Sequence, residues 1–199
     1  MRARFGTAGN PDGFYQAGKK QSKDMPPWLR EQGLEAYEYQ CGKGVHVGEE
    51  TARKVGQAAQ ENDIVLSLHA PYFINLANPD PQALEKTIGY ITGACLVAGW
   101  MGAGRVIIHS GALMKRTRRE AMDTALRSLK AVIQACDDGG FGHISLCPET
   151  MGKINQLGDL DEVLELCTVD ERLVPCVDFG HLYARSLGAL DGAEAMDAM

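Results

Sequence analysis

The sequence predicts an α/β fold, a TIM-type parallel (β/α) barrel. Short apolar runs typical of buried strands recur along the chain, and the segments between them are long enough to hold a crossover helix. A polar side chain stands at or just after the end of several runs, as at His69, His109 and Glu149. Because the loops that follow parallel barrel strands gather at one face, these side chains are expected to converge.

The elements can be placed in order from their composition. The expected strands are 2–5, 34–39, 64–68, 105–108, 143–147 and 173–177. The expected helices between them are 27–32, 49–61, 81–100, 119–136 and 161–166. Pro81 suits the first turn of its helix, and Gly102 and Gly104 mark its end, because proline is tolerated where a helix begins and glycine where one stops.

Six such strand–helix units are fewer than the eight that close a TIM barrel. We therefore expect one domain, residues 1–199, that is incomplete at its C-terminus. A barrel left open exposes the edges of its first and last strands, and exposed edges favour association with another chain. A homo-oligomer that covers the open edge is therefore one expected arrangement.

Composition narrows the class of protein. The chain has 199 residues, of which 45% are hydrophobic, and a net charge of −6. No apolar run approaches the length of a membrane span, and the six cysteines contain no C-x-x-C pair. We expect a cytoplasmic protein with reduced cysteines that does not bind membranes. The negative charge argues against holding nucleic acid by overall charge but allows a local groove.

Five side chains at the predicted strand ends have the chemistry of metal ligands. They are His69, His109, Glu149, Asp178 and His181. Imidazole and carboxylate together suit a borderline divalent metal such as zinc, and Glu and Asp can bridge two ions. Two ions a few ångströms apart can activate water against a phosphodiester. The remaining histidines, His46 and His143, are expected to be structural, since one lies in a Gly-rich loop and the other starts a strand.

Four segments resemble the endonuclease IV family of apurinic/apyrimidinic endonucleases, which are zinc-dependent TIM barrels. The segments are Leu68-His-Ala-Pro-Tyr-Phe-Ile-Asn75, Val106-Ile-Ile-His-Ser-Gly111, Leu146-Cys-Pro-Glu-Thr-Met-Gly152 and Pro175-Cys-Val-Asp-Phe-Gly-His181. Their order and spacing are similar to those of the family. The resemblance extends over nearly the whole chain.

The resemblance implies a role for each matched residue. His69 and His109 would bind one zinc, and Glu149 would be the catalytic carboxylate that bridges it to a second zinc. Asp178 would bind the second ion, and His181 would belong to a third. The family's later His-x-Asp-x-His-like region is absent here, so the first ion alone would keep its full set of protein ligands. The implied reaction is hydrolysis of the phosphodiester 5′ to an abasic site in double-stranded DNA.

Four residues are predicted to contact DNA. Tyr72 matches a family position associated with the abasic site, and Asn75 follows it in the same loop. Lys115 and Arg116 come after the strand that ends at His109, so their charges are expected near the metal face, where they can meet phosphates.

Two other functions stay open at this point. One is a xylose-isomerase-like sugar isomerase or epimerase, because that related barrel group also places Glu and Asp metal ligands at strand ends. The other is a catalytically inert remnant that still binds metal or DNA. The basic loop and the His, Glu and Asp-x-x-His set favour the nuclease.

Overall fold

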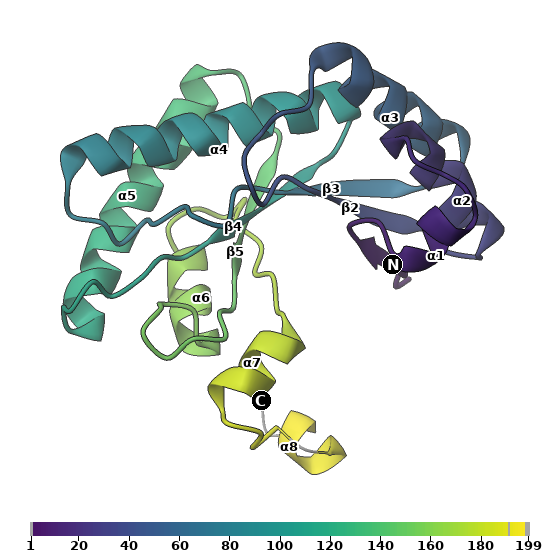
Figure 1. The fold of residues 1–199 in the computed structure, drawn as a ribbon. Helices are drawn as coiled ribbons and strands as arrows, with labels where there is room; N and C mark the ends of the chain where they lie inside the picture. The colour runs from purple at the N-terminus through teal and green to yellow at the C-terminus, as the bar shows by residue number, and fades with distance from the viewer. Residues whose placement is uncertain (1, 191, 198–199) are drawn as a thin grey trace.

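The computed structural model describes residues 2–190 and 192–197, so Met1, Asp191, Ala198 and Met199 of the expected domain lie outside it. Five parallel strands form one sheet in chain order. Figure 1 shows this sheet curving, with the long helices along its outer side. The predicted α/β fold is confirmed as a partial TIM barrel with five parallel strands. The strands are β1 (Gly6–Ala8), β2 (Ala36–Gln40), β3 (Val65–His69), β4 (Arg105–His109) and β5 (Ser145–Glu149).

A helix follows each of the strands β2 to β5, which is the repeat that the sequence predicts. α4 packs on β3 and β4, and α6 packs on β5. Among the described residues, no helix combines the length and the apolar composition that crossing a bilayer requires. The helices are α1 (Asp12–Gln16), the 3-10 turn η1 (Ser22–Asp24), α2 (Met25–Glu31), α3 (Glu49–Glu61), α4 (Pro81–Met101), α5 (Arg118–Asp138), α6 (Leu160–Cys167), α7 (Phe179–Arg185) and α8 (Ala193–Asp197).

The expected sixth strand at 173–177 is wrong as a strand, although the chain does run parallel to β5 there. Val174 N donates to Leu146 O and Cys176 N donates to Pro148 O, at 3.2 and 2.9 Å. The next rung of such a ladder would need an N–H at position 148, and proline has none. The segment therefore keeps one isolated parallel bridge, between Glu149 and Cys176.

The first strand also lies elsewhere than expected, at Gly6–Ala8 in place of 2–5. Phe5 is 71% exposed, so the apolar residue that suggested a buried strand is on the surface. Pairing with β2 starts at Gly6, where the backbones approach so closely that a Cβ would lie 1.8 Å from Ala36 O. A side chain cannot fit there, and glycine permits the approach.

The two faces of the sheet differ in chemistry. The outer face is apolar and buried beneath the helices, as at Leu68, Val106 and Ile108. The inner face bounds a cavity of about 670 Å³ whose wall includes Glu38, Ser67, Ile107, Cys147 and Cys176. Side chains alternate between faces along a strand. His69, His109 and Glu149 each come two residues after an inner-face residue, so they lie on the inner face at the ends of their strands.

α3 and α4 touch at a glycine, which gives a matched test of packing. A Cβ at Gly56 in α3 would lie 2.4 Å from Met101 O, whereas a Cβ at Gly93 in α4 would meet nothing within 4 Å. Both glycines are inside helices, so the intrinsic preference for alanine is the same at both.

We predict that Gly56→Ala destabilises the fold by about 1–3 kcal/mol through overpacking. Gly93→Ala should stabilise it by roughly 0.5–1 kcal/mol through helix propensity. Urea unfolding followed by circular dichroism measures both changes. Equal shifts of the same sign in the two variants would contradict the close α3–α4 approach.

Candidate metal centre

Two histidines and one glutamate meet at the ends of β3, β4 and β5. His69, His109 and Glu149 are the last residues of these strands. Nε2 of His69 lies 3.3 Å from Glu149 Oε2, and Nε2 of His109 lies 3.2 Å from the same oxygen. The register makes this possible, since His109 pairs directly with Glu149, while His69 pairs with Ile107 two residues lower. The two imidazole rings stand edge to face.

The other ring nitrogen of each histidine is held by a backbone carbonyl. His69 Nδ1 lies 2.7 Å from Ala70 O, and His109 Nδ1 lies 2.8 Å from Tyr72 O. A carbonyl only accepts, so each Nδ1 carries the hydrogen and donates it. Nε2 is therefore the nitrogen of each ring that faces Glu149, where it can donate a hydrogen to the carboxylate or, without that hydrogen, bind a metal ion.

The charge of this first cluster favours a cation. Burial raises the pKa of Glu149, but the hydrogen bonds with His109 and His69 outweigh it and lower that pKa to about 2. Glu149 is 6% exposed, so an ionised carboxylate here needs a positive charge beside it. Burial lowers the pKa of His69, and the hydrogen bond with Glu149 reverses this and leaves it raised.

The two separations between the histidines and Glu149 can be compared with those in a tetrahedral metal site. Zinc takes imidazole nitrogen and carboxylate oxygen at roughly 2.0–2.1 Å in tetrahedral geometry, which puts neighbouring donor atoms about 3.3–3.4 Å apart. The observed separations of 3.3 and 3.2 Å are close to this value. The residues present therefore fit a divalent metal without rearrangement of the strands.

A second cluster shares Glu149 with the first. Glu149, Asp178 and His181 offer ligand atoms that lie within 4.8 Å of one another, as do His69, His109 and Glu149. Here the other carboxylate oxygen, Oε1, lies 3.7 Å from His181 Nδ1, and Asp178 Oδ2 lies 3.6 Å from the same nitrogen. Glu149 thus turns one oxygen to each cluster. Because His181 Nδ1 is engaged by Thr150 O, Nε2 is the nitrogen of His181 that is left to bind a metal ion. All five predicted ligand positions lie at one end of the sheet, and their role as ligands stays a prediction.

The residues predicted to contact DNA divide into two kinds. Tyr72 is 55% exposed, and Lys115 is exposed with a φ of 63°. Asn75 instead joins two loops, since its Oδ1 accepts from Ala77 N at 3.1 Å and Ala112 N at 3.0 Å. Arg116 is half-buried, and its guanidinium donates to Ala77 O and to Thr124 Oγ1. Tyr72 and Lys115 are therefore free to meet a ligand, whereas Asn75 and Arg116 shape the loops.

Two contributors were absent from the sequence expectations. Thr150 follows Glu149, and its carbonyl accepts from His181 Nδ1 at 2.8 Å while its hydroxyl accepts from Asp178 N at 2.8 Å. Glu38 faces the inner cavity from β2 and accepts from Gln40 Nε2 at 2.7 Å. The alternation of β2 could have indicated Glu38, since it is two residues before Gln40, which pairs with His69.

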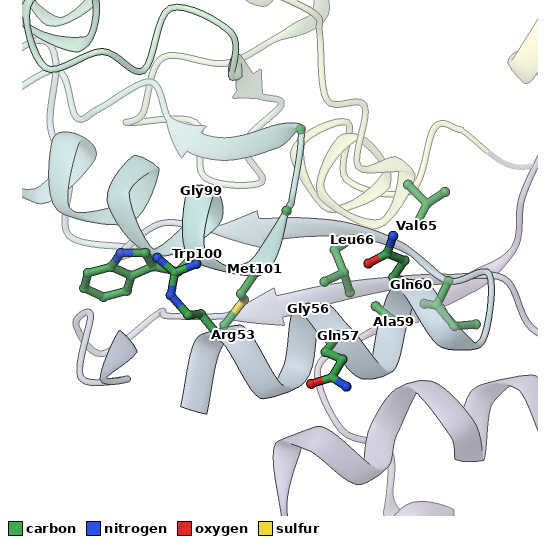
Figure 2. A pocket seen from close by; sticks show the side chains of 13 residues that line it. Arg53, Gly56, Gln57, Ala59, Gln60, Val65, Leu66, Gly99, Trp100 and Met101 are labelled. Atoms are coloured by element: carbon green, nitrogen blue, oxygen red, sulfur yellow. The ribbon is translucent and has the colours of Figure 1, made fainter. Parts of the chain in front are cut away.

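Two surface grooves lie at opposite ends of the strands. A groove of about 700 Å³ is lined by Gln40, Lys43, His46 and Tyr72, and it therefore opens beside His69. Another, of about 760 Å³, lies between α3, the end of α4 and the start of β3, with Arg53, Gln57 and Trp100 on its wall (Figure 2). Neither groove is lined by a residue of the metal clusters, but the carbonyl of Tyr72 in the first groove accepts from His109 Nδ1. The first is the better placed to bring a ligand to the clusters.

Comparison with known proteins identifies one family over most of the chain. Residues 26–198 match the Xylose isomerase-like TIM barrel family. An uncharacterized protein of Methanocaldococcus jannaschii, MJ0133, is 33% identical over 187 residues, which cover 94% of this chain and 65% of the relative. A probable endonuclease 4 of Mycoplasma pneumoniae is 30% identical over 137 residues, which cover 66% of this chain and 46% of the relative. The chain thus spans less than two thirds of the length of both.

Solved structures share the fold. The 3-keto-D-glucoside 4-epimerase YcjR of E. coli superposes with a TM-score of 0.70 at 12% identity, over 99% of this chain and 75% of that one. At this identity the likeness concerns the fold alone, and chemistry must be argued from the site.

We predict that His109→Ala weakens zinc binding at the first cluster by on the order of 100-fold or more. Removing even an outer partner of a ligand costs about 10–100-fold, and His109 is itself a donor. Competition with a chromophoric zinc chelator measures the affinity. The control is His143→Ala, because His143 is exposed just before β5, at the opposite end of that strand from Glu149. Unchanged zinc affinity in the His109 variant would exclude this residue as a ligand.

Proposed function

Because this chain belongs to the Xylose isomerase-like TIM barrel family, we propose that it carries the metal site of a DNA endonuclease that hydrolyses the phosphodiester 5′ to an abasic site. The observation that carries the proposal is the bridging geometry of Glu149, with one oxygen facing His69 and His109 and the other facing His181. A carboxylate shared by two metal clusters suits phosphodiester hydrolysis, where two ions are held a few ångströms apart. The probable endonuclease 4 of Mycoplasma pneumoniae supports the same class.

The protein's part in this reaction is to hold and orient charge. Zinc ions bound at the clusters would lower the pKa of water and neutralise the charge that builds on phosphate oxygens. Glu149 stays ionised at neutral pH and holds both clusters at a fixed separation. His69 and His109 keep their Nε2 atoms directed at the first cluster through their bonds to Ala70 O and Tyr72 O.

The surface beside the clusters suits a nucleic acid strand. Tyr72 lines the groove of about 700 Å³ and its carbonyl accepts from His109 of the first cluster, while its ring packs edge to face against Phe73 at 5.8 Å. Exposed aromatic rings stack on bases or fill a gap in the base stack. Lys43 in the groove and Lys115 beyond β4 supply positive charge for phosphates.

The test is cleavage of a duplex that carries one synthetic abasic site, with added zinc or with EDTA. We predict zinc-dependent incision on the 5′ side of the lesion, and Glu149→Gln should abolish it because the bridging charge is lost. Incision that persists in EDTA, or in the Glu149 variant, would contradict the proposal.

Lys115→Ala should weaken binding of the same duplex and reduce the slope of log affinity against log salt by about 1. Lys130→Ala is the matched control, because Lys130 is an exposed lysine on α5, outside the loops at the metal end. Fluorescence anisotropy over a salt series measures both. Identical slopes for the two variants would remove Lys115 from the DNA surface.

A sugar isomerase or epimerase is the second candidate, favoured by Glu38. This carboxylate faces the inner cavity of about 670 Å³, and burial raises its pKa despite the nearby His69 and the hydrogen bond from Gln40. A carboxylate and an amide side by side can bind the hydroxyl groups of a small sugar, and the epimerase YcjR shares the fold.

The sugar enzyme would be supported if the wild type interconverts ketoses and does not incise abasic DNA, and if Glu38→Gln loses the ketose reaction. Zinc or DNA binding without either reaction would identify a catalytically inert remnant.

A further inference from the structure

Helix α7 and its N-cap residue Asp178 supply two of the three residues of the second cluster, yet the helix has little apolar packing. Asp178 caps its first turn by accepting from His181 N at 2.8 Å, and Leu182 is its buried side chain. Phe179 and Tyr183 are about half exposed. Figure 1 shows α7 below the end of β5, away from the layer of long helices. Polar contacts must therefore fix its position relative to Glu149.

Those contacts are made at both ends of α7, and both reach the segment that follows Glu149. At the first end, the Thr150 hydroxyl accepts from Asp178 N and donates to Asp178 O, at 2.8 and 3.2 Å. At the last end, Arg185 Nη1 donates to the carbonyls of Met151, Lys153 and Gln156, at 3.3, 3.0 and 3.2 Å. The loop 150–158 thus forms hydrogen bonds with both ends of α7.

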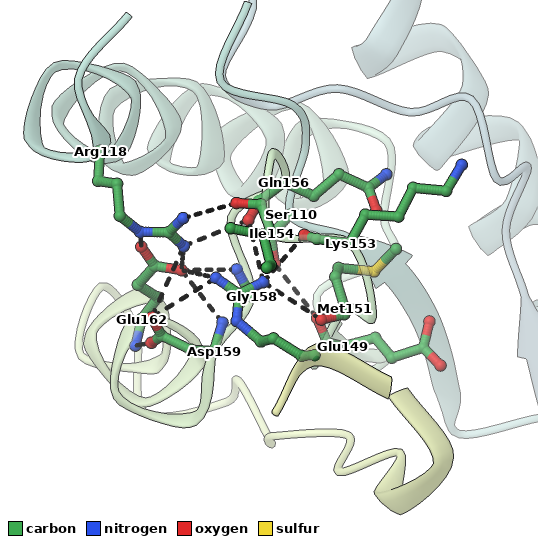
Figure 3. A network of polar contacts seen from close by, with 11 residues as sticks. Ser110, Arg118, Glu149, Met151, Lys153, Ile154, Gln156, Gly158, Asp159 and Glu162 are labelled. Carbon is green, nitrogen blue, oxygen red and sulfur yellow. Dashed lines mark hydrogen bonds and ion pairs between the residues drawn. The ribbon is translucent and has the colours of Figure 1, made fainter. Parts of the chain in front are cut away.

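A second arginine and a shared glutamate complete the network (Figure 3). Arg118 donates to both carboxylate oxygens of Glu162, at 2.7 and 2.5 Å, and to the carbonyls of Ile154 and Gln156. Glu162 also accepts from Gly158 N at 2.8 Å and lies 4.0 Å from Arg185 Nη2. The two guanidiniums therefore hold the loop from α5 and from α7, and the carboxylate of α6 balances their charge.

The burial of Arg185 separates this network from ordinary surface ion pairs. Its side chain is 12% exposed, whereas pairs of exposed charges contribute little to a fold. Its Nη1 faces the loop carbonyls while its Nη2 lies 3.7 Å from Asp159 Oδ2 and 4.0 Å from Glu162 Oε2, and the single ammonium of a lysine cannot reach both sides at once. The cost of burying the guanidinium is offset by its hydrogen bonds to the loop carbonyls and by the nearby carboxylates of Asp159 and Glu162.

We propose that Arg185 is a positioning residue of the second metal cluster. Together with Arg118 and Glu162 it sets the distance of Asp178 and His181 from Glu149. The inference rests on the proposed function in one respect, that the second cluster binds a metal ion. It requires neither a nuclease nor an epimerase reaction, so its test can use metal binding and the state of His181.

The experiment compares Arg185→Ala, Arg185→Lys and Arg172→Ala in the full chain. Arg172 is the matched control, because it bonds Asp137, Asp170 and the carbonyl of Gly142 in a similar network away from both clusters. Zinc titration gives the affinity of each cluster. Nitrogen-15 NMR of the metal-free chain reports the tautomer of His181, whose Nδ1 hydrogen is donated to Thr150 O.

We expect Arg185→Ala to weaken the second zinc by about 10-fold or more, in the range found for outer partners of metal ligands, and to leave the first zinc within about 2-fold. In the metal-free variant the Nδ1–H signal of His181 should give way to a mixture of tautomers. Arg185→Lys should recover part of the affinity, and Arg172→Ala should change neither readout.

Equal weakening of both zinc ions by Arg185→Ala and Arg172→Ala would overturn the inference, since it would show general destabilisation. A His181 signal unchanged in Arg185→Ala would overturn it as well, even where incision and epimerisation are both absent. If the wild type binds a single zinc, the tautomer of His181 alone tests the positioning role. A changed tautomer in Arg185→Ala, together with an unchanged one in Arg172→Ala, supports that role.

Discussion

The buried charge of Glu149 is the constraint on which the rest of the site depends. An ionised carboxylate that is almost fully enclosed is costly unless positive charge and hydrogen-bond donors surround it. Here the partners come from three directions, with His69 and His109 on adjacent strands and His181 on α7. Each imidazole is oriented by a bond from Nδ1 to a backbone carbonyl, so the protein fixes the positions of the donors before any ion arrives.

Rigid and adjustable parts of the site have different origins. The first cluster is built on strand ends whose register is fixed by the parallel ladder of β4 and β5. The second cluster depends on a short helix that polar contacts hold in place, through Thr150 at one end and Arg185 at the other. Changes in loop 150–158 should therefore alter the second cluster while the first keeps its geometry.

Much of the fold and the convergence of the site followed from sequence pattern, because a parallel barrel puts its strand ends at one face. The convergence of His69, His109 and Glu149 could be predicted from that rule and the spacing of the apolar runs. The predicted sixth strand does not form because Pro148, on the neighbouring strand β5, has no N–H to donate to it. Pro148 lies outside the run 173–177, so the composition of that run could not indicate the effect. Asn75 and Arg116 were expected on a DNA surface, and pattern alone could not show that Ala77 and Ala112 would engage them. The histidine carbonyl partners are backbone atoms, which carry no sequence signal at all.

The shared fold does not decide the reaction, since epimerases and endonucleases are both built on this barrel. The donor atoms around Glu149 are what distinguish a metal site from an ordinary polar strand end. The most direct measurement is anomalous diffraction at the zinc edge from crystals of the chain loaded with zinc. We expect an ion bound by Nε2 of His69, Nε2 of His109 and Oε2 of Glu149. An ion bound elsewhere, or through Nδ1 of either histidine after loss of the carbonyl bonds, would contradict this expectation.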